Sequence, residues 1–229
     1  MRRYFVRVAP AALLGILLLF ASCASQLQYY DFDGESLRVH VMIAPDARVD
    51  ADYGVEIDPD NPVRTLVSIG TSVAMASQVE QAQRKMDAAT RNLDIGQILE
   101  SQLESYYERA FDMRIADSSR RTTYDLSIEV TEYGIEASGP GSDVDFVLRG
   151  QARMYDTASR ERIWRDRFSS RIQISPTMFG LPAAAGNVFS AAMLADLTEE
   201  EIATGLQNVA YDAAWEVASE FERDFYRGR

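Results

Sequence analysis

The 229-residue chain has one cysteine and one histidine, the two residue types that build many catalytic and metal sites. Triad-type hydrolases need a histidine base, and zinc and other transition metals are held mainly by histidine and cysteine. Because Cys23 is the single cysteine, no disulfide can form within the chain. We therefore expect a fold that depends on packing alone, no enzyme of these classes, no metal site and no non-covalent cofactor.

Basic residues are scarce relative to acidic ones. Lys85 is the only lysine, and the formal net charge is −12. An acidic surface repels phosphate backbones, so we expect no nucleic-acid partner. The turn Gly139-Pro140-Gly141 lacks the lysine that follows the glycines of a phosphate-binding loop.

The N-terminus has the pattern of an export signal. Arg2, Arg3 and Arg7 precede an unbroken apolar run over residues 11–20, and small residues then precede Cys23. This ending resembles the lipobox of bacterial prolipoproteins, whose positions here are Leu19, Phe20, Ala21 and Ser22. We expect residues 1–22 to be removed and Cys23 to carry a covalent lipid such as palmitate, which anchors the protein in a membrane.

Two other interpretations of the N-terminus remain open, an uncleaved membrane anchor and a plain secretory signal. The apolar run is shorter than the roughly 20 residues that a membrane-spanning helix needs. Removal of the signal leaves 20 basic against 35 acidic residues, a net charge of −15. Ala24 and Ser25 lack the aspartate that resembles an inner-membrane retention signal, so we expect the periplasmic face of the outer membrane.

The rest of the chain is predicted to be a lipidated tether over residues 23–35 and one domain over residues 36–229. Alternating apolar residues predict strands at 37–43, 124–131, 144–154 and 162–168, the last two joined as a hairpin at 156–159. Helical periodicity over 66–111 and 197–226 predicts helices there, with Asp94 and Thr198 as caps. The predicted fold class is α+β, with a small, mostly antiparallel sheet of four to five strands and helices packed on one face.

Two further segments are candidates for binding sites because of their composition. The acidic stretch 46–62 does not follow the calcium-loop pattern, which favours a solvated loop. The nearly uncharged stretch 176–195 is a candidate contact with a membrane, with a partner or with the protein's own core. Its candidate contact residues are Phe179, Leu181, Val188, Phe189 and Met193.

The strand at 124–130, the strand at 144–155, the turn at Asp156-Thr157 and Trp164 together resemble a pattern of auxiliary lipoproteins of ABC-type transporters. More distantly, they are similar to the curli-secretion lipoprotein and to the N-terminal domain of the Tol-system propeller protein. The resemblance covers roughly residues 94–225 and implies a small sheet with helices on one side. The helix near 69–90 and the Ala/Gly-rich stretch 179–193 depart from that pattern, which leaves the partner open.

We therefore expect a non-catalytic, lipid-anchored envelope lipoprotein that serves a transport, secretion or envelope-maintenance assembly. Its expected partners are a membrane and another envelope protein, and homo-oligomerisation stays open. One alternative is a periplasmic carrier of lipid or another apolar ligand. A second alternative is a carboxylate-dependent hydrolase that uses Asp143 with Asp145, or Glu129 with Glu132.

Overall fold

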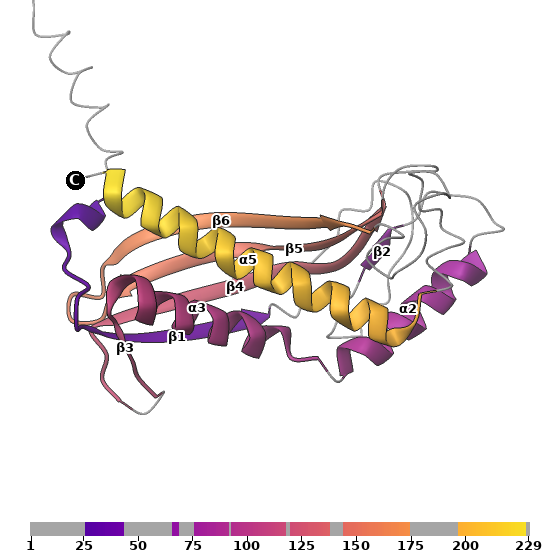
Figure 1. Ribbon diagram of the computed structural model, residues 1–229, viewed down its shortest axis with the longest axis horizontal. Coiled ribbons are helices and arrows are strands. Elements are labelled where there is room, and N and C mark those ends of the chain that lie inside the picture. The colour runs from indigo at the N-terminus through magenta and orange to yellow at the C-terminus, as the bar shows by residue number, and fades with distance from the viewer. Residues whose placement is uncertain are drawn as a thin grey trace, which may run out of the picture.

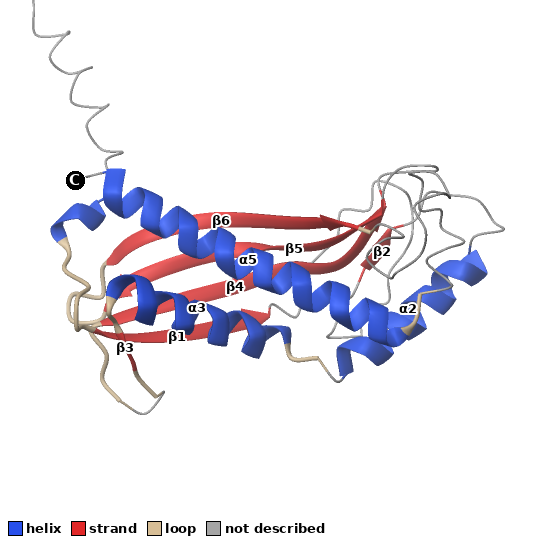
Figure 2. Ribbon diagram, viewed as in Figure 1, coloured by secondary structure: helices blue, strands red, loops and turns tan. Residues whose placement is uncertain are grey.

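The computed structural model describes residues 26–43, 66–68, 76–91, 93–117, 120–137, 144–174 and 197–227. They form one mixed sheet with helices over one of its faces, so the predicted α+β class is confirmed (Figures 1 and 2). Helix α3 (Ile95–Phe111) and helix α5 (Glu199–Arg227) lie side by side on that face. Helix α2 (Ala76–Arg91) packs against α5.

Six strands make up the sheet in the described part of the chain, whereas the sequence predicts four to five. Their order is β3-β1-β4-β5-β6, with β2 also paired to β4. The bounds are Ser36–Ile43 for β1, Leu66–Ser68 for β2, Arg114–Ile115 for β3, Tyr124–Ala137 for β4, Val144–Asp156 for β5 and Arg162–Gln173 for β6. The three long strands β4, β5 and β6 are antiparallel, whereas β1 runs parallel to β3 and β4, and β2 runs parallel to β4.

The predicted hairpin between β5 and β6 is confirmed. The Asp156 carboxylate accepts hydrogen bonds from the backbone N–H groups of Ala158 (2.8 Å) and Ser159 (2.9 Å), which closes the turn. Arg160 follows in the left-handed region with φ of 59°. The short polar side chain thus satisfies backbone donors that the ladder leaves free at the strand end.

Both predicted helix caps are present. The Asp94 carboxylate accepts a hydrogen bond from Gln97 N–H at 2.9 Å, at the start of α3. Before α5, the Thr198 hydroxyl accepts from Glu201 N–H (3.2 Å), while the Glu201 carboxylate accepts from Thr198 N–H (2.7 Å). This reciprocal capping box fixes where the 29-residue helix begins.

The helical prediction over 66–111 is wrong at its start. Leu66–Ser68 forms β2, which pairs in parallel with Gly134, Ile135 and Glu136 of β4. A short apolar stretch fits a strand as well as a helix by periodicity alone, and pairing with β4 decides the outcome. The helices begin only at Ala76 and Ile95.

The folded domain begins earlier than the predicted boundary at residue 36. Gln26–Tyr29 forms a 3-10 helix, η2, and Leu27 and Phe32 are buried in the core. The Tyr124 hydroxyl also donates to the Asp31 carbonyl at 3.0 Å. Burial of these two large apolar side chains fixes the segment on the domain. The expected tether over 23–35 is therefore part of the folded domain from Gln26 onward.

Several predicted features lie outside the described residues. They are Cys23 with its lipobox, the acidic stretch 46–62, the turn at 139–141, Asp143 and the candidate contact residues between 176 and 195. Among the helices that the structure describes, none combines the length and apolar character needed to cross a bilayer.

Candidate functional site

The sheet face opposite the helices carries a row of ion pairs that crosses four strands. Side chains alternate along each strand, and the residues between the buried positions point to this face. We call this row the outer-face network. Its pairs are Arg38–Asp125 (2.6 Å), Arg153–Glu129 (3.1 Å), Arg149–Glu132, Arg149–Glu136, Arg171–Glu136 (2.9 Å) and Arg171–Asp145 (2.8 Å).

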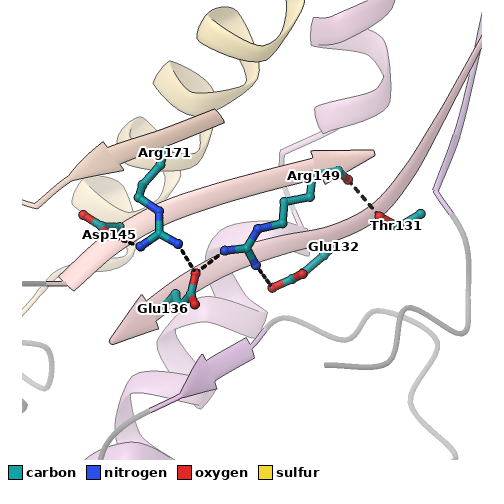
Figure 3. A network of polar contacts seen from close by, with 6 residues as sticks. All are labelled: Thr131, Glu132, Glu136, Asp145, Arg149 and Arg171. Atoms are coloured by element: carbon teal, nitrogen blue, oxygen red, sulfur yellow. Dashed lines mark hydrogen bonds and ion pairs between the residues drawn. The ribbon is translucent and has the colours of Figure 1, made fainter. Parts of the chain in front are cut away.

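Arg149 and Arg171 are the central cations of the network. Arg149 donates to Glu132 through one terminal nitrogen and to Glu136 through the other (Figure 3). Arg171 links the same Glu136 to Asp145 of β5. Charge-assisted bonds of this kind are stronger than neutral ones, so the network ties β4, β5 and β6 together on their outer side.

A β-bulge in β4 brings these carboxylates to the outer face. Before the bulge, the even-numbered residues from Tyr124 to Val130 are buried; after it, Tyr133 and Ile135 are buried instead. Without this change of phase, Glu132 and Glu136 would point toward the helices. The sequence analysis missed the bulge, although the shift of apolar residues from even to odd positions signals it.

Of the four carboxylates proposed for a hydrolase, the structure describes Glu129, Glu132 and Asp145, and each is bonded to a basic or amide group. Glu129 accepts from Gln151 (2.7 Å) and Arg153 (3.1 Å), and Glu132 pairs with Arg149. These bonds make the three carboxylates part of the outer-face network that links neighbouring strands.

His40 lies exposed on β1, where it is in register with Ser127 of β4. It alternates with the buried residues Leu37 and Val39, so it shares the outer face with Arg38. The chain's single histidine is therefore a residue of the sheet surface.

Aromatic side chains fill the layer between the sheet and helices α3 and α5. Phe32 packs against Tyr124 (centroids 4.9 Å apart) and Phe221 (5.3 Å), and Phe221 also contacts Trp164 and Tyr107 (both 5.2 Å). A carrier of an apolar ligand would hold its cargo between these layers. In this region the protein's own rings occupy that position.

A set of exposed aromatic residues was not predicted. Tyr211, Trp215 and Tyr226 on α5 are 39%, 65% and 54% exposed, and Tyr29 on η2 is 80% exposed. Residues four and eleven apart lie near one face of a helix, so the three α5 residues form a stripe outside the core. The spacing of these aromatic residues is visible in the sequence, but the same helix also carries a longer apolar stripe that marks its core-facing side.

Tyr106 and Tyr107 on α3 and Tyr124 on β4 are among the tyrosines whose pKa values are raised. Burial, followed by the hydrogen bond that its hydroxyl donates to Glu222, raises the pKa of Tyr106 to about 12. Burial, followed by the charge of Glu35, raises the pKa of Tyr124 to about 12. Burial also raises the pKa of Tyr107 well above its ordinary value, and its hydroxyl finds no hydrogen-bond partner among the described residues.

No family model matches the chain, and no curated protein matches it. Several solved structures share part of its shape at low similarity. The PelC dodecamer from Paraburkholderia phytofirmans is 16% identical, over 76% of this chain and 87% of that one, with a TM-score of 0.31. Protein XCC0632 from Xanthomonas campestris is 14% identical (56% and 64% covered, TM-score 0.31), and lipoprotein GNA1162 from Neisseria meningitidis is 11% identical (61% and 83% covered, TM-score 0.29).

Proposed function

We propose that this chain is a non-catalytic lipoprotein, anchored through a lipid on Cys23 to the periplasmic face of the outer membrane. There it serves as a component or accessory of a transport, secretion or envelope-maintenance assembly. The sequence supports the anchor through the basic, apolar and small-residue order that ends at Cys23. The charged but internally paired outer face supports a structural rather than a catalytic role.

The position of the fold relative to Cys23 carries this proposal. Gln26, three residues after Cys23, already belongs to η2, which is fixed by the buried Leu27. Three residues span at most about 11 Å, so a lipid on Cys23 would hold the domain directly at the membrane surface.

The partner-binding role has its own support on α5 and β6. The Trp164 indole N–H donates to Asp224 at 3.1 Å, which fastens the hairpin that resembles transport auxiliary lipoproteins to α5. The opposite side of α5 then presents Tyr211 and Trp215 to solvent. Exposed aromatic residues of this kind are enriched at protein interfaces.

Labelling of cells with radioactive palmitate tests the anchor. Wild-type protein is expected to take up the label, and Cys23→Ser is expected to lose it. A matched control, Cys23→Ser with Ser25→Cys, restores a thiol two residues away and should stay unlabelled because the signal enzymes act at one position. Equal labelling of wild type and Cys23→Ser would overturn the proposal.

Photo-crosslinking in intact cells tests the partner. A photoreactive residue at Trp215 or Tyr211 should give one adduct with the same envelope protein, whereas Arg165, exposed on β6, should not. The captured protein should in turn retain this chain when it is purified by its own tag. Adducts that are equally diverse at all three positions would contradict an assembly role for α5.

A further inference from the structure

Tyr29 and Tyr226 are the two most exposed aromatic residues at the end of the domain where the described chain begins. They come from opposite ends of the sequence, but η2 contacts α5 and lies beside its last turn (Figure 1). Phe32 packs on Phe225 with ring centroids 5.4 Å apart, and Phe225 contacts Tyr226 at 5.1 Å. Both tyrosines therefore occupy the same end of the molecule.

The fold holds Tyr29 outward. Leu27 and Phe32, on either side of it, are fully buried, and the Tyr30 N–H donates to the Leu27 carbonyl at 3.1 Å. Tyr29 is nevertheless 80% exposed. An apolar ring that is kept in water on a well-packed support is expected to gain free energy wherever it meets a less aqueous surface.

We infer that Tyr29 and Tyr226 enter the headgroup layer of the membrane that holds the lipid of Cys23, and so fix the orientation of the domain on it. This inference rests on the proposed lipid anchor. Tyrosine suits that layer because its ring is apolar and its hydroxyl is polar, which is why membrane proteins carry aromatic belts at this depth.

The covalent distances fit this arrangement. The chain from Cys23 to Gln26 spans at most about 11 Å, and the 3-10 helix adds about 6 Å to Tyr29. The headgroup layer on each side of a bilayer is about 5 to 8 Å thick, so the Tyr29 side chain can reach it while Cys23 lies at its inner boundary.

Trp215 offers an internal contrast because it lies on the same exposed stripe of α5. It precedes Tyr226 by eleven residues, which corresponds to about 16 Å along a helix. That distance exceeds the thickness of the headgroup layer. If the domain contacts the membrane with the end that carries η2, Trp215 therefore stays in water.

Quenching of tryptophan fluorescence by brominated phospholipid tests the inference on the acylated protein, purified from membranes and placed in phosphatidylcholine vesicles. Trp215→Phe leaves only the buried Trp164 and sets the baseline. Tyr29→Trp and Tyr226→Trp are each made in that background, and wild type reports on Trp215. Acylation by palmitate label and flotation with vesicles are recorded on the same samples.

Quenching above baseline is expected to be at least about twofold greater at positions 29 and 226 than at Trp215, because the headgroup layer is thinner than the 16 Å between them. Protein that is acylated and floats but shows equal quenching at all three positions would overturn this inference and leave the anchor intact. Protein that takes up no label would overturn both. Circular dichroism of each variant confirms that these exposed positions tolerate tryptophan.

Discussion

Gly205 of α5 lies directly against the ring of Phe146 on β5, and a methyl group at that position would overlap the ring. Gly205→Ala is therefore expected to destabilise the protein by about 1 to 3 kcal/mol, the usual cost of overpacking, although alanine favours a helix by about 1 kcal/mol. Urea unfolding measures the change. Thr204→Ala, at the exposed neighbouring position, should stay within about 0.5 kcal/mol of wild type. A Gly205→Ala variant as stable as Thr204→Ala would show that α5 does not pack this closely.

Arg149 and Arg171 each pair with two carboxylates, but the Arg149 side chain is less exposed (26% against 43%), so we expect Arg149 to be the more important cation of the outer-face network. Arg149→Met leaves both carboxylates without this partner, and we expect a loss of about 1 to 3 kcal/mol in the free energy of unfolding. Arg165→Met, on the exposed part of β6, is the control and should change little.

A triple variant separates the network from simple packing. In Arg149→Met, Glu132 loses its cationic partner, and Glu136 and Asp145 share Arg171 alone. Adding Glu132→Gln and Glu136→Gln removes this excess negative charge, so the triple variant should recover part of the lost stability. If the triple variant is instead less stable than Arg149→Met alone, the carboxylates contribute through contacts other than Arg149.

The raised tyrosine pKa values predict alkaline unfolding. A tyrosine whose pKa is about 12 when folded and 10.0 when unfolded holds its proton more tightly in the folded state. Its stabilising contribution is complete below pH 10 and is lost as the pH rises from 10 to 12. Urea unfolding at a series of pH values should show this decline, and Tyr106→Phe with Tyr124→Phe should make it shallower. Double-variant and wild-type curves of equal slope would contradict the assignment.

The Tyr107 hydroxyl is buried without a hydrogen-bond partner among the described residues, so its removal should cost nothing. We expect Tyr107→Phe to equal wild type or to gain up to about 1 kcal/mol. Tyr124→Phe is the contrast because it removes a 3.0 Å hydrogen bond to the Asp31 carbonyl and should lose about 1 kcal/mol. Thermal and urea unfolding of both variants measure these changes in stability. A clear loss in Tyr107→Phe would reveal an ordered water at that hydroxyl.

Local patterns in the sequence predicted the fold where short-range chemistry decides it. The caps at Asp94 and Thr198 and the turn at Asp156 depend on hydrogen bonds within three residues, and all three are present. The alternation that starts β4 likewise depends only on which face is buried. These features predicted most of α3, α5 and the β5–β6 hairpin.

Features that depend on distant partners were missed. Leu66–Ser68 becomes a strand because β4 offers it an edge, and residues 26–32 join the domain because α5 and β4 supply rings for Phe32 to contact. The β4 bulge brings Glu132 and Glu136 to Arg149. It was missed because its only sign in the sequence is a shift of the apolar residues from even to odd positions within one strand. The exposed stripe on α5 was missed because the larger set of core-facing residues dominates the helical periodicity of the same segment.

The parallel pairing of β1 with β4 has a consequence for how the protein is made. Arg38 on β1 and Asp125 on β4 bond across 87 residues of chain, and α5, which covers the sheet, is the last element. The sheet therefore cannot assemble while only the first half of the chain has emerged from the ribosome, and loop closure on this scale slows folding. A newly made chain therefore lacks its helical cover over the sheet until Glu199–Arg227 has been synthesised.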